Sequence, residues 1–223
     1  MEVVIVLGGP NTKEDIKKLL ENRYAKAYED FRFIGVDGGA LRLLDQHIPM
    51  EVAIGDFDSV TKEQRDLIHE AANTIVELPS EKDDTDFEAA LLWVKEHYEG
   101  VPIHVLGSFG GRVDHAISTL WTMMRPDLAP LIPYVVFEDA TNVVNFIQPG
   151  TYTIEKMDFT KYLSFISMTP VENLTLQNVK YTLDSKSYAY PVALVSNEFT
   201  SDKMTISFTK GLILVAQTRD HWR

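Results

Sequence analysis

The sequence predicts an N-terminal α/β domain followed by a C-terminal all-β domain. Short apolar runs alternate with helical patterns through the first half of the chain, which is typical of β–α units and a parallel sheet. The segment "RPDLAPLIP" then carries Pro126, Pro130 and Pro133, a density that excludes a continuous helix and suggests a domain boundary. Beyond it, strand-like patterns follow one another without a strong helix. We therefore place the α/β domain at residues 1–129 and the all-β domain at residues 130–223.

The expected strands of the α/β domain are short apolar runs at 3–7, 31–36, 52–54, 74–78 and 103–106. Helices between them are predicted where residues of one face recur three and four positions apart. The groups with this spacing are Ile16, Leu19, Leu20 and Arg23; Phe87, Ala90, Leu91 and Val94; and Ile117, Leu120, Trp121 and Met124. Thr61 and Gln64 have the spacing of a capping box, which predicts that a further helix begins there. Asp84 or Thr85 is the expected cap of the helix that begins near Asp86.

The second domain is predicted from segments in which apolar and polar residues tend to alternate, as they do in half-buried strands. These segments are 134–138, 151–156, 162–168, 174–179, 193–199, 204–209 and 212–217. Their number and short length predict a small antiparallel β-sandwich or barrel.

Composition restricts the class of function. The 223 residues are 45% apolar and 24% charged, which is ordinary for a globular protein, and the formal charge of −12 argues against general binding to nucleic acid or to a membrane surface. An acidic protein can still bind polyphosphate if a divalent cation reverses the local charge. Cysteine is absent, which excludes disulfides and thiolate chemistry and suits a reducing cytosol. The opening "MEVVIVLGGP" is too short for a signal peptide, so we expect a cytoplasmic protein.

Acidic and glycine-rich turns follow several of the predicted strands. The carboxylates in these turns are Asp37 in "VDGGA", Asp56 and Asp58 in "GDFDS", Asp83, Asp84 and Asp86 in "KDDTD", and Asp114 in "GGRVDH". Each turn alone can also be explained by Asx hydrogen bonding or helix capping. In an open parallel sheet, however, the carboxyl ends of the strands meet at one edge, where ligands bind. The sequence therefore predicts one acidic cleft.

The chemistry of this cleft follows from its residue types. Clustered carboxylates repel one another and need a compensating cation, and a set of oxygen ligands without cysteine favours Mg²⁺. An EF-hand is excluded because Thr61 stands where that loop requires glycine. Lys82 and Arg112 can neutralise phosphate oxygens, and glycines such as Gly38 and Gly110 let backbone N–H groups approach a polyphosphate. These features indicate metal-dependent phosphoryl-type transfer.

The ordered motifs "DGGA" (37–40), "GDFDS" (55–59), "KDDTD" (82–86) and "GGRVDH" (110–115), with "SN" in the all-β tail, resemble those of the thiamine pyrophosphokinase family. The resemblance covers nearly the whole chain. It implies a Rossmann-like nucleotide-binding domain, a C-terminal β-sandwich, and a homodimer with active sites between subunits. The implied reaction is transfer of a diphosphoryl group from ATP to the hydroxyl of thiamine, with release of AMP.

The resemblance also implies roles for individual residues. Asp56, Asp58 and Asp86 would hold Mg²⁺ and the phosphates, and either Asp114 or Asp86 would orient the thiamine hydroxyl. Ser196 stands at a position expected to contact the thiamine pyrimidine, and Phe199 is the nearby aromatic. The expected catalytic residues are Asp56, Asp58, Asp86, Asp114 and Arg112. The expected ATP- and thiamine-binding residues are Asp37, Gly38, Lys82, Asp83, Thr85, Gly110, Gly111, Ser196, Asn197 and Phe199.

Two other function classes fit parts of the sequence. A sugar-nucleotide transferase with a metal-binding DxD motif would explain "DFD" but not the further acidic motifs or the short β tail. A non-catalytic module that binds thiamine or a nucleotide would need no clustered carboxylates. The identity of the reaction products separates these alternatives from diphosphoryl transfer.

Overall fold

The computed structural model describes residues 1–9, 16–79, 81 and 83–220. It divides into two units, Met1–Ala140 and Thr141–Arg223. This division differs from the boundary that we placed after residue 129, because the proline-rich segment belongs to the first unit. Pro126–Leu131 forms a 3-10 helix, η4, whose leucines Leu128 and Leu131 are buried. The strand that follows, β6 (Val135–Glu138), pairs in parallel with β5 (Ile103–Leu106) of the first unit.

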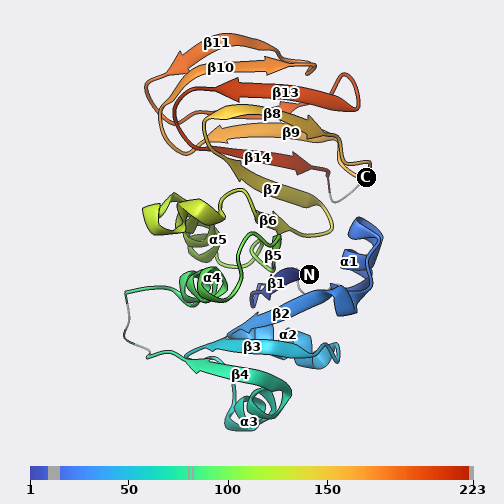
Figure 1. The fold of residues 1–223 in the computed structure, drawn as a ribbon, viewed down its shortest axis with the longest axis vertical. Coiled ribbons are helices and arrows are strands. Elements are labelled where there is room, and N and C mark those ends of the chain that lie inside the picture. The colour runs from blue at the N-terminus through green and yellow to red at the C-terminus, as the bar shows by residue number, and fades with distance from the viewer. Residues whose placement is uncertain (10–15, 80, 82, 221–223) are drawn as a thin grey trace. The chain divides into compact units, whose positions relative to one another are not determined.

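The first unit is a parallel sheet with helices on both faces (Figure 1). Its other strands are β1 (Glu2–Val6), β2 (Phe31–Val36), β3 (Met50–Gly55) and β4 (Ala72–Glu77). Its helices are α1 (Ile16–Tyr24), α2 (Gly38–Asp45), α3 (Lys62–Ala71), α4 (Asp86–His97) and α5 (Val113–Trp121), with 3-10 helices η2 (Tyr28–Asp30) and η3 (Thr122–Met124). The strand order β6-β5-β1-β2-β3-β4 reverses direction at β1. Ligands bind beside such a switch point, outside the carboxyl ends of the strands.

Apolar side chains explain which helix covers which face. Ile16 and Leu20 of α1 share a core with Leu43 of α2 and Ile68 of α3, against one face of the sheet. On α4, a stripe that includes Phe87 is buried on the opposite face, and the Phe87 ring packs at 5.9 Å against that of Phe137 in β6. The predicted capping box at Thr61 is confirmed, and of the two candidate caps of α4 it is Thr85 that caps the helix, also through a capping box. Within the described residues, no helix is long and apolar enough to cross a membrane.

Helix α2 was not among the predicted helices. It begins at the "DGGA" turn, and its second residue, Gly39, lies against β1. A Cβ atom at Gly39 would stand 1.8 Å from the carbonyl oxygen of Val6, so only glycine lets the helix approach the strand this closely. Because glycine has a low helix propensity, the "DGGA" motif predicted a turn rather than the start of a helix.

The second unit is antiparallel throughout its named sheets. Its strands are β7 (Asn142–Ile147), β8 (Gly150–Glu155), β9 (Tyr162–Ser167), β10 (Val171–Gln177), β11 (Leu183–Tyr188), β12 (Ala193–Asn197), β13 (Lys203–Phe208) and β14 (Ile213–Thr218). Within this unit the hydrogen-bonded strand orders are β12-β9-β14-β7 and β11-β10-β13-β8. Side chains of both sheets, including Phe165 of β9 and Ile206 of β13, share one core. Strands β7 and β11 were not predicted, and the polar "LDSKSY" of β11 has no clear apolar alternation.

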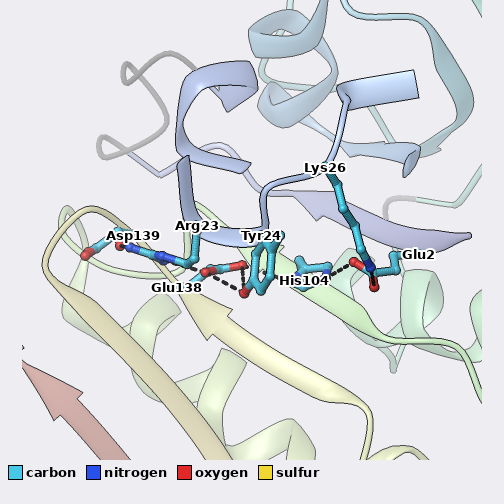
Figure 2. A network of polar contacts seen from close by, with 7 residues as sticks. All are labelled: Glu2, Arg23, Tyr24, Lys26, His104, Glu138 and Asp139. Atoms are coloured by element: carbon cyan, nitrogen blue, oxygen red, sulfur yellow. Dashed lines mark hydrogen bonds and ion pairs between the residues drawn. The ribbon is translucent and has the colours of Figure 1, made fainter. Parts of the chain in front are cut away.

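A buried ionic network joins α1 to the sheet of the first unit. Figure 2 shows its members, which are Glu2, Arg23, Tyr24, Lys26, His104, Glu138 and Asp139. Glu138 is fully buried at its centre; Arg23 pairs with it, the Tyr24 hydroxyl donates to it at 2.9 Å, and Nδ1 of His104 lies 2.9 Å from it. The other ring nitrogen of His104 lies 3.1 Å from Glu2. Burial raises the pKa of Glu138, but the His104 hydrogen bond and the Arg23 charge outweigh burial and hold that pKa below its usual range.

Candidate active site

Three carboxylates meet at the carboxyl ends of the central strands. Asp37 follows β2, Asp56 follows β3, and Asp86 opens α4. One carboxylate oxygen of each lies within 4.8 Å of the others, and all three residues are half-buried. Strands β2 and β3 are hydrogen-bonded neighbours, and this adjacency brings Asp37 and Asp56 together. The edge of the sheet thus carries an acidic group close to the switch point beside β1.

The "GDFDS" turn is shaped to hold this group. A Cβ atom at Gly55 would stand 2.1 Å from Oδ1 of Asp37, so glycine is needed to admit that carboxylate. Phe57 adopts a positive φ of 53° while its ring is buried, and its N–H donates to Oδ1 of Asp37 at 3.4 Å. The N–H of Asp58 donates to Oδ1 of Asp56 at 3.2 Å. Such unfavourable backbone conformations persist where surrounding packing fixes them, often at functional sites.

The electrostatics of the group favour a bound cation. Burial, a hydrogen bond to Asp86, and the charges of Asp86 and Asp56 raise the pKa of Asp37 to about 7, although the N–H of Phe57 partly offsets them. The three side chains supply only oxygen donors, which are the ligands that Mg²⁺ prefers. The residues present therefore fit a hard divalent cation.

The position of Asp58 differs from that of the other predicted metal ligands. Asp58 is exposed, and the group of three oxygens contains Asp37 in addition to Asp56 and Asp86. Sequence reasoning placed Asp37 in the cleft but not among the metal ligands. The sequence pattern does not give strand order, and only the structure shows that β2 and β3 are neighbours, so that the residue after one strand lies beside the residue after the other.

The start of α5 carries the remaining predicted catalytic residues at the surface. Arg112 and Asp114 pair with each other through two hydrogen bonds of 2.6 and 3.2 Å, with 72% and 61% of their side chains exposed. The hydrogen bond from Arg112 holds the pKa of Asp114 below its usual range. Gly110 and Gly111 precede the pair with positive φ angles of 84° and 72°. Arg112 is thus accessible to an anionic ligand.

The other predicted residues of the cleft lie in the loop before α4, except for Gly38, which lies in α2. Thr85 is the N-cap of α4; Gly38 is the first residue of α2. Asp83 is exposed, and Asp84 pairs with Arg125, which sequence reasoning did not identify. Lys82 lies outside the described residues. A groove of about 460 Å³ runs beside this loop along α4 and β4, and its described lining includes Asp83 and Asp84 but none of the three clustered carboxylates.

In the second unit, the predicted thiamine-binding residues have different surroundings. Asn197 is buried. Its side-chain amide accepts from the N–H of Tyr181 and donates to the carbonyl oxygen of Tyr181, both at 2.9 Å. Phe199 is half-buried against the core of the unit. Ser196 is exposed and adopts a positive φ of 60°. Asn197 thus fixes the backbone beside Ser196, which is itself accessible.

Comparison with known proteins identifies the family. Family models described as the catalytic domain and the vitamin B1 binding domain of thiamin pyrophosphokinase match residues 26–133 and 151–213. The thiamine pyrophosphokinase of Bacillus subtilis is 33% identical over 218 residues, which are 97% of this chain and 98% of that protein. This chain belongs to the thiamine pyrophosphokinase family. The resemblance inferred from the sequence motifs is thereby confirmed.

Solved structures of the thiamine pyrophosphokinase family have the same fold. A thiamin pyrophosphokinase family protein from Enterococcus faecalis matches with a TM-score of 0.88 and 32% identity, over 99% of this chain and 100% of that one. The Bacillus subtilis thiamine pyrophosphokinase matches with a TM-score of 0.82 and 32% identity at the same coverage. The three clustered carboxylates lie within the catalytic-domain match, and Ser196 lies within the vitamin B1 binding-domain match.

Asp37→Asn is expected to stabilise the metal-free protein at neutral pH and to weaken its binding of divalent cations. The pKa of Asp37 rises from 3.8 to about 7 on folding, so the folded state holds this proton more tightly than the unfolded chain. Ionisation of Asp37 therefore costs the wild type stability as pH rises from about 4 to about 7. The variant avoids this cost, so its advantage in melting temperature should grow across that range and then level off.

Thermal unfolding in EDTA at several pH values between 5 and 8 measures this effect. Asp45→Asn, on the exposed side of α2, is the matched control because it makes the same chemical change away from the cluster. Equal melting temperatures of Asp37→Asn and wild type at pH 8 would show that the carboxylates do not repel one another in the folded protein.

Proposed function

We propose that this protein transfers a diphosphoryl group from ATP to the hydroxyl of thiamine, giving thiamine diphosphate and AMP. The observation that carries the proposal is the group Asp37, Asp56 and Asp86, whose oxygens lie within 4.8 Å of one another in the region that matches the family's catalytic domain. A site that only bound thiamine would have no need of three carboxylates held close enough to repel one another.

The proposed chemistry is an in-line displacement at the β-phosphorus of ATP. The thiamine hydroxyl oxygen forms a bond to that phosphorus, and the bond from phosphorus to the oxygen bridging the α-phosphate breaks, so that AMP leaves with the electron pair. The hydroxyl proton passes to a carboxylate, for which Asp114 and Asp86 are the candidates. Positioning and neutralisation of charge are the main contributions that the protein can make to such a reaction.

Asp37, Asp56 and Asp86 are the proposed metal ligands, with Asp58 as a further candidate from the sequence. Mg²⁺ held there would neutralise the phosphate oxygens. Arg112, exposed at the start of α5, is proposed to contact the phosphates once they are bound. The backbone N–H groups of Gly38 and Gly39, at the first turn of α2, are suited to a phosphate oxygen, whereas that of Ala40 already donates to the carbonyl oxygen of Asp37.

The two units have different proposed roles in substrate binding. The first unit would bind ATP through Asp83, Thr85 and the glycines of its turns. The second unit would bind thiamine through the segment from Ser196 to Phe199 and would form a homodimer with active sites between subunits. Cytoplasm is the proposed compartment, in keeping with the absence of cysteine.

The direct test is to incubate the protein with ATP, Mg²⁺ and thiamine and to separate the products by chromatography. AMP and thiamine diphosphate in equal amounts are the expected result. ADP with thiamine monophosphate would contradict diphosphoryl transfer. Thiamine binding without AMP would favour a binding module, and a nucleoside diphosphate released from a nucleotide sugar would favour the glycosyl-transfer alternative. Light scattering on the purified protein tests the homodimer.

A further inference from the structure

We propose that Arg125 is a positioning residue for the candidate metal site, because its guanidinium fixes the first turn of α4 and thereby the place of Asp86. The inference rests on the proposed function only in taking the three carboxylates as a cation site. It can be tested by cation binding alone, so it can fail while the reaction is confirmed, or hold while the reaction fails.

Arg125 contacts carboxylates from two elements at once. One guanidinium nitrogen, Nη1, pairs with Asp84 and lies 3.4 Å from Glu88. The other side donates to Asp127 through Nε at 3.1 Å and Nη2 at 2.8 Å. The Arg125 side chain is 29% exposed, so these charges are partly withdrawn from water. The two-point contact with Asp127 fixes the direction of the guanidinium relative to η4, and Nη1 then faces the carboxylates of Asp84 and Glu88.

Two of these partners flank Asp86 closely in the chain. Asp84 lies two residues before Asp86, and Glu88 lies two residues after it. Glu88 also accepts from the N–H of Thr85 at 2.8 Å in the capping box of α4. The positively charged guanidinium of Arg125 therefore contacts residues on both sides of Asp86. It also reduces the repulsion among the carboxylates of this stretch.

The segment that carries Arg125 is itself fixed. The Arg125 N–H donates to the carbonyl oxygen of Thr122, and the Arg125 carbonyl accepts from Leu128, whose side chain is fully buried. Lys95 of α4 donates to the carbonyl oxygen of Asp127 at 2.7 Å. The backbone of Arg125 is thus held between η3 and η4, and its guanidinium holds the start of α4 in place against them.

A purely structural ion pair and a positioning residue predict different results. Loss of a structural pair would lower stability without changing cation affinity. Mg²⁺ and Mn²⁺ depend on well-placed ligands, and residues that orient metal ligands commonly change affinity by about 10- to 100-fold when replaced. Arg125 acts through Asp84 and Glu88 rather than on Asp86 directly, so a change of roughly tenfold is expected.

The test is titration of the purified protein with Mn²⁺, followed by electron paramagnetic resonance of the free ion, without nucleotide or thiamine. Arg125→Met should bind Mn²⁺ roughly tenfold more weakly than wild type, and Arg125→Lys should fall between them because it keeps the charge but not the fork. Arg65→Met is the matched control, since it breaks a surface pair with Glu77 at 2.8 Å, and it should bind like wild type.

Three outcomes would overturn the proposal: wild-type affinity in Arg125→Met, an equal loss in Arg65→Met, or absence of Mn²⁺ binding by the wild type. If Arg125→Met does not fold, the Mn²⁺ affinities of Asp84→Asn and Arg125→Lys test the proposal instead. Wild-type affinity in both variants would overturn the proposal. If Mn²⁺ binding behaves as expected but no AMP forms from ATP and thiamine, the proposed reaction fails while the role of Arg125 stands.

Discussion

Replacing Asp86 with asparagine is expected to lower kcat for thiamine diphosphate formation by roughly 10²- to 10³-fold, the usual effect of removing one electrostatic stabiliser from an active site. The substitution keeps the size of the side chain and removes one charge from the group whose oxygens lie within 4.8 Å. The capping box of α4 is formed by Thr85 and Glu88, so it does not depend on the carboxylate of Asp86. The helix should therefore persist, and the loss should appear in turnover rather than in folding.

Two companion variants make this result specific. Asp66→Asn, on the exposed side of α3, removes one negative charge elsewhere and should leave kcat unchanged. Asp58→Asn tests the ligand that the sequence predicted and that lies exposed beside the group. A loss as large as that of Asp86→Asn would assign Asp58 to the cation as well. If Asp86→Asn kept near-normal turnover and an unchanged melting temperature, the cluster of three carboxylates would have no role in the reaction.

Glu138→Ala is expected to lower the free energy of unfolding by about 3–5 kcal/mol, the usual cost of leaving a buried charge without its partner. The Glu138 side chain is fully buried, and the Arg23 side chain that pairs with it is only 7% exposed. Without Glu138, the Arg23 guanidinium, the Tyr24 hydroxyl and one nitrogen of His104 lose a hydrogen-bond partner together (Figure 2). These groups belong to α1 and β5, so their loss loosens the packing of α1 on the sheet.

Urea unfolding, followed by far-UV circular dichroism, measures this loss of stability. The matched control is Glu172→Ala, which breaks an exposed pair with Lys210 at 2.9 Å and should cost about 1 kcal/mol or less. Glu138→Gln should fall between the two variants, because the amide can still accept from Tyr24 but no longer balances Arg23. Equal stability of Glu138→Ala and Glu172→Ala would show that the network contributes no more than a surface pair.

Local features of the sequence determined much of the first unit. Apolar runs located strands β1 to β5, and three- and four-residue spacing located α1 and α4. The Thr61 capping box was predicted correctly because it involves residues only three positions apart, and Thr85 was one of the two candidates for the cap of α4. The ordered acidic motifs identified the family, since each motif is a contiguous string. Where local signals were weak, as in the glycine-rich start of α2 and the polar strand β11, the elements were missed.

The tertiary structure alone decided which distant residues meet. Asp37 joins Asp56 because β2 and β3 are neighbours, and Arg125 reaches Asp84 because η4 packs against α4. The proline-rich segment was predicted to be a boundary, yet burial of its leucines keeps it in the first unit. Distances between residues far apart in the chain depend on strand order and helix packing, which periodicity does not encode. The sequence by itself determined the chemistry available at the sheet edge, whereas the fold decided which carboxylates come close enough to share one cation.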